Sequence, residues 1–293
     1  MKLKIRETVS MKVIILAMAV FCLPLKAQKL VKDSVRIGGY TRNYQMFLPE
    51  NLKDGAPLVI VCHGYGSEAP IKTWMNDAAL KHGFAVCVPL GLKDPKGRHA
   101  WNVGYPFQQG WKVNDVQTLC TLAKTVQRKY KLSKDNTFLT GMSNGGEMCY
   151  LMAFSDQSTF KAVAPISGLM MEWMYKKMEA KHPLPVFEVH GTKDHTSEWD
   201  GDLTNQGGWG EYMPVPVAIG YWVAKNRCTH EEIEKVPSLK GIEGHYVIKH
   251  KYTGSPYGAD VWLYEVINDK HSWHTDDLDT GEEVWSFFSK YIK

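Results

Sequence analysis

The chain has 293 residues, of which 44% are hydrophobic and 12% aromatic, and it contains no low-complexity tract. Such a composition is typical of a globular protein with a sizeable core. The formal charge of +4 arises at the N-terminus: residues 1–27 hold five basic side chains and one acidic one, which leaves 30 of each sign elsewhere. A neutral remainder gives no electrostatic reason to expect nucleic acid or an anionic membrane as a partner.

Residues 1–27 have the pattern of a cleaved export signal. A lysine precedes an apolar run that ends at Pro24, and the small residue Ala27 stands at a plausible cleavage point. The run is too short to span a bilayer. We therefore predict a signal peptide over 1–27, one catalytic domain over 28–293, and a secreted or periplasmic protein. A start at Met11 and a buried N-terminal helix are the alternatives.

The strand and helix patterns alternate along the rest of the chain. Strands are predicted at 35–37, 44–48, 57–62, 84–89, 137–140, 162–166, 186–190 and 261–267. Helices are predicted at 72–82, 115–130, from 144 onward and at 281–291. This alternation predicts an α/β fold in which a mostly parallel sheet carries helices on both faces.

Three long segments interrupt this alternation, at 91–111, 168–183 and 196–216. Each follows a predicted strand, so each is expected near the carboxyl edge of the sheet, where open α/β folds bind ligands. Together they contain five tryptophans, namely Trp101, Trp111, Trp173, Trp199 and Trp209.

Cysteine usage argues against a disulfide scaffold and against zinc. Five cysteines lie beyond residue 27, at irregular spacings and without a CxxC pair: Cys62, Cys87, Cys120, Cys149 and Cys228. The first four stand in apolar contexts, where a free thiol behaves as a small hydrophobic group. We predict no metal and no cofactor, and the sequence leaves open whether Cys228 is paired.

The segment 141–146 reads GMSNGG and carries the strongest chemical signal. It follows a predicted strand and precedes a predicted helix, which is the context in which G-x-S-x-G marks a nucleophilic serine. Gly141 and Gly145 leave room for a sharp turn that exposes the hydroxyl of Ser143 at the positive end of the helix. A glycine-rich helix cap is the structural alternative.

A serine nucleophile needs a base, and the base needs an acid that orients it. In this arrangement the acid follows a later strand and the histidine lies near the C-terminus. Asp194 directly follows strand 186–190, and His271 follows strand 261–267. We therefore predict Ser143, Asp194 and His271 as the triad. The rival acids are Asp200 and Asp202, and the rival base is His274.

The oxyanion of such a reaction needs two donors. One is predicted to be the backbone N–H of Asn144, which follows the nucleophile. The other is predicted to be the N–H of Tyr65, in the loop after strand 57–62, with Gly64 as the alternative. His63 is expected to hold this loop through hydrogen bonds and not to act in the reaction.

These segments resemble the α/β-hydrolase esterase family that groups polyhydroxybutyrate depolymerases with feruloyl and acetylxylan esterases. The resemblance covers nearly all of 28–293 and rests on PLVIVCHGYG, GMSNGG, AVAPISG, HGTKD and the closing KHSWH and VWSFF. It implies the same triad and the α/β-hydrolase fold. The chain departs from the family at His63-Gly64-Tyr65, where members often carry HGC, and after His271, where a glycine- and proline-rich run is usual.

The tryptophans suggest a planar or sugar-like ligand, since rings stack on such groups. We predict Trp199, Trp209 and Trp273 as substrate-binding residues, although tryptophans that merely pack the loops are the structural alternative. With export and the resemblance, this favours feruloyl or acetyl esters on plant cell-wall polysaccharide. The alternatives are a short-chain polyester hydrolase, a serine peptidase and a non-catalytic carbohydrate-binding relative. The oligomeric state is left open.

Overall fold

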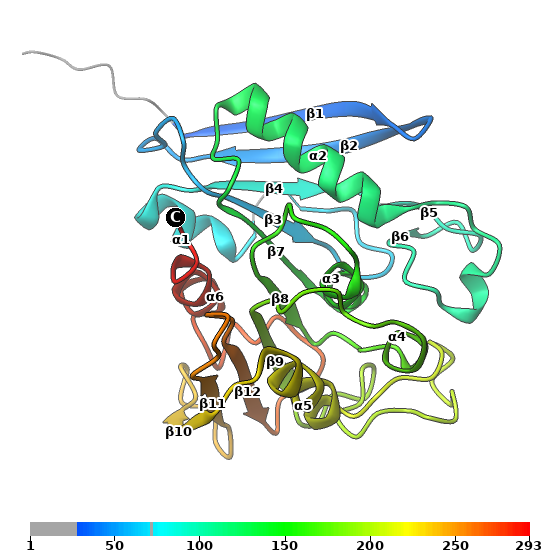
Figure 1. Ribbon diagram of the computed structural model, residues 1–293, viewed down its shortest axis with the longest axis vertical. Coiled ribbons are helices and arrows are strands. Elements are labelled where there is room, and N and C mark those ends of the chain that lie inside the picture. Colours follow the sequence, from blue (N-terminus) through cyan, green and yellow to red (C-terminus); the bar gives the residue numbers. More distant parts are fainter. Residues whose placement is uncertain (1–27, 71–72) are drawn as a thin grey trace, which may run out of the picture.

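The computed structural model describes residues 28–70 and 73–293, and the predicted signal peptide lies outside this range. The described chain forms a ten-stranded sheet in the order β1-β2-β4-β3-β7-β8-β9-β12-β11-β10. The six neighbouring strands from β4 to β12 run parallel, and the strands at both edges are antiparallel. A mostly parallel sheet with helices on both faces was predicted, and it is present (Figure 1).

The strands of the large sheet are β1 (Lys29–Ile37), β2 (Tyr40–Leu48), β3 (Leu58–Cys62), β4 (Ala85–Pro89), β7 (Thr137–Met142), β8 (Val163–Ile166), β9 (Val186–Gly191), β10 (His230–Pro237), β11 (Tyr246–Thr253) and β12 (Val261–Ile267). The helices are α1 (Met75–His82), α2 (Asp115–Tyr130), α3 (Asn144–Phe154), α4 (Glu172–Lys177), α5 (Val215–Asn226) and α6 (Thr280–Ser289), with a 3-10 helix η1 (Pro106–Gln108). β5 (Leu92–Lys93) and β6 (His99–Ala100) form a separate hairpin.

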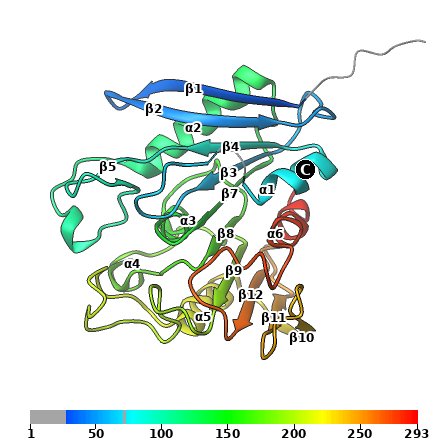
Figure 2. The same ribbon diagram turned by 180° about the vertical axis from the view of Figure 1, so that it is seen from behind.

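The helices divide into two layers. α2, α3 and α5 cover one face of the sheet, while α1 and α6 cover the other (Figures 1 and 2). All five residues of β3 are buried, as are all five of β4, because central parallel strands have helices on both sides. The apolar face of α2 buries Leu119, Leu122 and Val126.

The residues at the two ends of α2 explain where this helix begins and where it ends. The side chain of Asn114 accepts a hydrogen bond from the Gln117 N–H at the N-terminus, and Lys131 ends the helix in the left-handed region with φ 53°. The predicted bounds of this helix, 115–130, are confirmed. The helix predicted over 72–82 is described only from Met75 to His82.

The sequence missed the antiparallel edge formed by β10 and β11. Seven of the eight residues of β10 are exposed, so its sequence lacks the apolar alternation by which a half-buried strand is found.

Helix α5 was also missed. Its first turn carries Val215, Pro216 and Val217, and Gly220 stands in its middle, which gives a weak helical signal.

The three long segments lie at one edge of the sheet. The first contains β5, β6 and η1, the second contains α4, and the third leads into α5. Figures 1 and 2 both place β5 and α4 at the same side of the sheet, beyond the carboxyl ends of its parallel strands. This edge is where α/β folds bind ligands.

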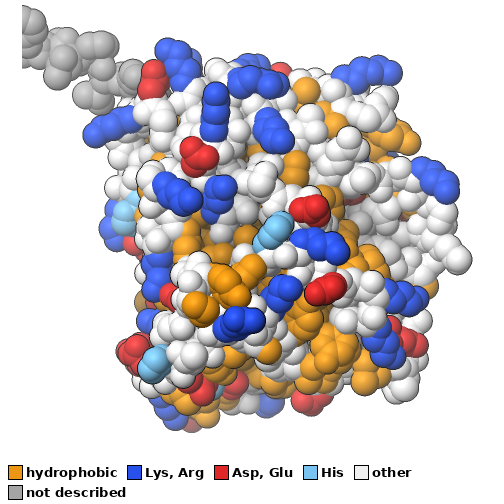
Figure 3. Space-filling model, in the orientation of Figure 1, with side chains coloured by type: hydrophobic (Ala, Val, Ile, Leu, Met, Phe, Trp, Pro, Cys, Tyr) orange, Lys and Arg blue, Asp and Glu red, His pale blue; other side chains and the backbone are white. Residues whose placement is uncertain are grey.

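On the face drawn in Figure 3, basic side chains are scattered with acidic side chains between them, and hydrophobic side chains gather mainly in the lower half.

Within the described range, all five cysteines are free thiols. Among the helices of residues 28–70 and 73–293, we find none with the length and apolar character that a membrane span requires.

Candidate active site

Ser143 lies at the turn between β7 and α3, in a backbone conformation that side chains rarely adopt. Its φ and ψ are 56° and −124°, and its N–H donates to the carbonyl of Ile166 at 2.9 Å. A Cβ on Gly141 would lie 2.6 Å from the carbonyl oxygen of Gly145, and a Cβ on Gly145 would lie 2.3 Å from that of Cys62. Only glycine fits at these two positions, so the turn can close and lift the serine above the sheet.

His271 and Asp194 form a short hydrogen bond although they come from different strands of the sheet. Nδ1 of His271 donates to Oδ2 of Asp194 at 2.6 Å, from the loops that follow β12 and β9. Oδ1 of Asp194 accepts from the backbone N–H groups of Thr196 and Ser197, each at 2.8 Å. Burial opposes the charge of this carboxylate, but the bonds from His271 and the two amides still lower its pKa below the ordinary value.

A buried pair behind Asp194 was not found from the sequence. His190 and Glu188 have no exposed surface, and Nδ1 of His190 lies 2.8 Å from Oε1 of Glu188. Nε2 of His190 donates to the carbonyl of Ser197 at 2.7 Å and lies 3.6 Å from Oδ2 of Asp194. Burial opposes protonation, yet the Glu188 bond raises the pKa of His190. This buried pair stands directly behind the predicted acid.

A cavity of about 350 Å³ opens beside Ser143 and His271. Its wall is largely apolar and aromatic, and both predicted reacting side chains belong to it. The lining residues are Val61, His63, Gly64, Tyr65, Ser67, Pro70, Thr73, Val88, Met142, Ser143, Thr196, Trp209, His271 and Trp273. An ester carbonyl in this cavity has access to a serine hydroxyl and to an imidazole.

The loop after β3 approaches the predicted nucleophile closely. A Cβ on Gly64 would lie 3.5 Å from the Cβ of Ser143, so the loop at Gly64 lies beside the serine. The hydroxyl of Tyr65 donates to Asp94 at 2.9 Å, and the backbone N–H of Tyr65 stays the predicted second donor.

His63 holds this loop in place, as expected. Its Nε2 accepts from the Gly91 N–H at 2.9 Å, and its Nδ1 donates to the carbonyl of Gly64 at 2.7 Å. Burial lowers the pKa of His63 to about 4, so the ring is neutral near pH 7.

A polar network beneath the other predicted oxyanion residue was also missed. The side chain of Asn144 is buried, accepts from the N–H of Trp101 at 2.7 Å and donates to the Trp101 carbonyl at 3.2 Å. Glu147, one helical turn on, accepts from this amide and from the hydroxyl of Tyr105. Burial raises the pKa of Glu147 to about 7. The network fixes the start of α3 against the loop of 91–111.

Two of the three tryptophans predicted to bind substrate line the cavity. Trp209 packs against Tyr65, with ring centroids 5.4 Å apart, and Trp273 packs against Trp74 at 5.1 Å. Trp199 is not among the lining residues; it packs edge-to-face on His190 at 6.0 Å. The cavity lining therefore gives no support to the prediction for Trp199, whose ring contacts the buried histidine behind the predicted acid.

The rival triad residues have other partners. Asp202 accepts from the N–H groups of Thr204 and Gly207 and so closes its own turn. Asp200 is exposed. His274 is buried and bonds Ser167 and Asp269.

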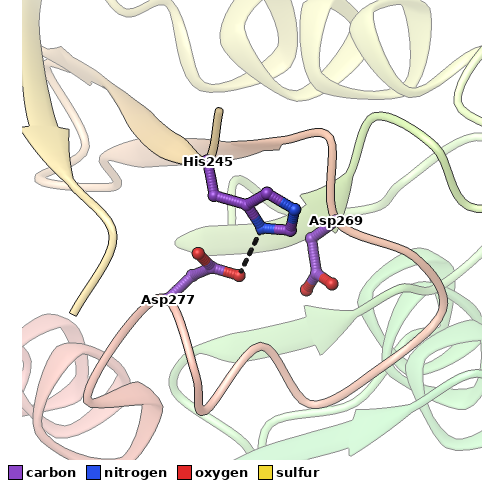
Figure 4. A group of neighbouring side chains, drawn as sticks. All are labelled: His245, Asp269 and Asp277. Carbon is purple, nitrogen blue, oxygen red and sulfur yellow. Dashed lines mark hydrogen bonds and ion pairs between the residues drawn. The ribbon is translucent and has the colours of Figure 1, made fainter. Parts of the chain in front are cut away.

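One group of described residues has a spacing suited to a metal ion. His245, Asp269 and Asp277 offer ligand atoms that lie within 4.8 Å of one another, and their side chains point toward a common centre (Figure 4). His245 pairs with Asp277 at 3.3 Å, while Asp269 already binds His274 at 2.6 Å and Ser272 at 2.9 Å. These bonds account for the cluster as a tether between loops, and we assign no metal to it.

Comparison with known proteins gives one family. The Esterase family matches residues 34–242. The bifunctional acetylxylan esterase/xylanase XynS20E of Neocallimastix patriciarum is 28% identical over 57% of this chain, which spans only 23% of that protein's length. Feruloyl esterase D of Neurospora crassa is 26% identical over 88% of this chain and 85% of its own.

Among solved structures, the acetyl xylan esterase from Aspergillus awamori superposes with a TM-score of 0.62 at 13% identity, over 89% of this chain and 99% of its own. The α/β-hydrolase fold predicted from the resemblance is thereby confirmed. Because the family match extends over more than half of the chain, the protein belongs to the Esterase family of carboxylic ester hydrolases.

Proposed function

We propose that this protein is an exported serine esterase that removes feruloyl or acetyl groups from plant cell-wall polysaccharide. The observation that carries the proposal is the 2.6 Å bond between His271 and Asp194 at a cavity that Ser143 also lines. An oriented imidazole next to a serine on a strained turn is the arrangement that acyl transfer requires.

The first half of the reaction acylates the serine. His271 takes the proton of the Ser143 hydroxyl through Nε2 while Oγ attacks the ester carbonyl. Asp194 holds the tautomer with the proton on Nδ1 and stabilises the imidazolium. The N–H groups of Tyr65 and Asn144 receive the oxyanion, and the alcohol leaves with the proton from His271.

The second half releases the acid. Water, deprotonated by the same imidazole, attacks the acyl-serine carbonyl, and Ser143 regains its proton as the carboxylic acid departs. The dipole of α3 points its positive end at the developing oxyanion in both halves. No step requires a cofactor.

The wall of the cavity favours an aromatic acyl group. Trp209 and Trp273 both line the cavity with Ser143, and Tyr65 meets Trp209 edge-on. Aromatic rings bind a planar feruloyl ring through offset or edge contacts worth about 0.5–1.5 kcal/mol each. The aliphatic part of the wall, which includes Val61, Val88 and Met142, also suits a short aliphatic acyl chain. A short-chain polyester is therefore the second candidate.

The assignment of export rests on the N-terminal pattern and fits a polymeric substrate, because a cell-wall polysaccharide is met outside the cell. The basic and apolar segment over 1–27 is proposed to be removed as a signal peptide.

Hydrolysis of methyl ferulate, 4-nitrophenyl acetate and a 3-hydroxybutyrate dimer, each with wild type and Ser143→Ala, tests the proposal. We expect wild type to cleave the ferulate with the highest kcat/KM and the variant to lose at least about 1,000-fold. Turnover of the acetate alone would move the substrate to acetyl groups, and preference for the dimer would move it to polyesters. A folded Ser143→Ala that keeps more than about a tenth of wild-type activity would overturn the mechanism.

A further inference from the structure

A second serine–histidine–aspartate set lies behind the predicted catalytic loop. Nε2 of His274 lies 2.9 Å from Oγ of Ser167, and Nδ1 of His274 lies 2.6 Å from Oδ2 of Asp269. Ser167 has no exposed surface and His274 is 1% exposed. Neither residue lines the cavity that contains Ser143, so the set is closed to substrate.

The direction of the hydrogen bonds follows from the groups involved. An ionised Asp269 only accepts, so Nδ1 of His274 carries the proton that it donates. Nε2 of a neutral ring then accepts from the Ser167 hydroxyl. Burial of His274 lowers its pKa, which agrees with a neutral ring, and its bond lowers the pKa of Asp269 despite the partial burial of that carboxyl.

Asp269 forms hydrogen bonds with both sequence neighbours of the predicted base His271. Its carboxylate accepts from the backbone N–H of Lys270 at 2.8 Å and from the hydroxyl of Ser272 at 2.9 Å, the two neighbours of His271. Its carbonyl accepts from the N–H of Lys193 at 2.9 Å, one residue before Asp194. The loops of the predicted acid and base are therefore joined at one residue.

The loop after β12 and the relay residue Ser167 contain backbone conformations that need support. His274 and Asn268 are in the left-handed region, with φ 58° and 66°, and Ser167 has φ 45°. Each such non-glycine residue costs about 1 kcal/mol or more, which surrounding bonds must offset. Ser272 adds a further tie, because its hydroxyl accepts from the His274 N–H at 2.8 Å.

We propose that Ser167, His274 and Asp269 form a buried relay that positions His271 against Asp194, and that His274 is a positioning residue for the esterase reaction. The proposal rests on the function proposed above. Without His274, the Ser167 hydroxyl is left with the Ser272 carbonyl at 3.4 Å as its contact with the segment 270–273. This link is weaker, and the imidazole of His271 departs from the geometry that proton transfer needs. Displacements of about 1 Å at a reacting group cost about 100-fold in rate.

The test uses paired substitutions at one position. His274→Ala removes both bonds, whereas His274→Asn keeps an amide N–H near the position of Nδ1 and tolerates a positive φ. We expect His274→Ala to lose about 10- to 100-fold in kcat with KM within about twofold of wild type, and His274→Asn to recover to within about threefold. Ser167→Ala, a small change in the core, should lose kcat in the same direction.

His245→Ala is the matched control. It removes the pair with Asp277, which lies beside Asp269 (Figure 4), and it changes no member of the relay. We expect it to lower Tm but keep kcat within about twofold, since it loosens the loop without releasing His274. Equal losses of kcat in His245→Ala and His274→Ala at similar Tm would overturn the proposal, because general destabilisation would then explain both.

A spectroscopic readout separates this proposal from the esterase assignment. The proton of the short bond between His271 and Asp194 is expected to give a strongly downfield NMR resonance, whose detection needs no substrate. We expect it in wild type, Ser143→Ala and His274→Asn, and its loss in His274→Ala. If it persists in His274→Ala with unchanged kcat, the relay has no positioning role although the esterase mechanism stands. If Ser143→Ala keeps esterase activity, the mechanism fails, and the resonance still decides on the relay.

Discussion

Nδ1 of His271 lies 2.6 Å from Oδ2 of Asp194, across 77 residues of sequence. The contact exists because β9 and β12 are parallel neighbours, so that the loops after them leave the same edge of the sheet. With Nδ1 committed to the carboxylate, only Nε2 is left to exchange a proton with substrate or serine. The predictions below depend on this pair, on the turn that carries Ser143 and on the walls around them.

Asp194→Asn should abolish most of the activity without unfolding the protein. An asparagine amide in this place donates to Nδ1 and so selects the tautomer with the proton on Nε2, which is unable to act as a base. We expect kcat to fall by about 10³- to 10⁴-fold for any ester that wild type cleaves. Steady-state kinetics with circular dichroism on the same samples measures this, and a variant within tenfold of wild type would exclude Asp194 as the orienting acid.

Gly145→Ala should destabilise the fold at the nucleophile turn. The added Cβ would lie 2.3 Å from the Cys62 carbonyl oxygen and 2.9 Å from that of His63, both of them backbone atoms of the buried β3 region. We expect the free energy of unfolding to fall by about 1–3 kcal/mol or more, as in other overpacked sites.

Gly220→Ala is the control for Gly145→Ala. Gly220 lies in α5, and a Cβ there meets nothing within 4 Å. We expect this exposed helical position to gain up to about 1 kcal/mol, since alanine favours a helix more than glycine does. Urea unfolding compares the two variants. Equal stabilities would show that the turn accommodates a side chain.

Trp209→Ala should weaken the binding of an aromatic ester. Trp209 lines the cavity, and it forms ring contacts with Tyr65 at 5.4 Å and Tyr105 at 5.3 Å. Loss of one aromatic contact of about 0.5–1.5 kcal/mol predicts a KM for methyl ferulate about 2- to 10-fold higher. Trp199→Ala, outside the lining, should leave KM within about twofold. A reversed order of the two variants would contradict the assigned wall.

Glu147→Gln should change how stability depends on pH. Burial raises the pKa of Glu147 from 4.5 to about 7 in the folded protein. Between these values the folded state keeps a proton that the unfolded state has released, so wild type loses stability as the pH rises through this window. Glutamine has no such proton. The unfolding free energy of the variant minus that of wild type should therefore increase from about pH 5 to pH 8, by about 3 kcal/mol at most. Urea unfolding at several pH values measures it, and a constant difference would contradict the shifted pKa.

Much of the fold could be predicted because its central elements follow simple periodic rules. β3 and β4 are continuous apolar runs, and α2 shows a clean amphipathic pattern between a capping asparagine and its left-handed end. Exposed β10 and the weakly helical α5 lack such patterns, and their structures depend on contacts with distant strands and with the core.

The site could be predicted as far as chain order and local motifs reach. Ser143, Asp194 and His271 each stand at a strand end, so one topology rule brings them together. The partners of these residues depend on three-dimensional packing. Nothing in the sequence indicates that Glu188 and His190 meet behind Asp194, or that His274 faces Ser167 across 107 residues. Trp199 was predicted to bind substrate but is not among the lining residues of the cavity, since a tryptophan in a long loop packs inward as readily as it lines a cavity.

The central claim is that Ser143 is the one activated serine, and a fluorophosphonate reagent tests it most directly. The reagent phosphonylates an activated serine hydroxyl with loss of fluoride, and peptide mass spectrometry locates the adduct. We predict one adduct per chain, on Ser143, with none in Ser143→Ala and a strongly slowed reaction in Asp194→Asn. An unlabelled wild type, or an adduct on another serine such as Ser167, would contradict the account.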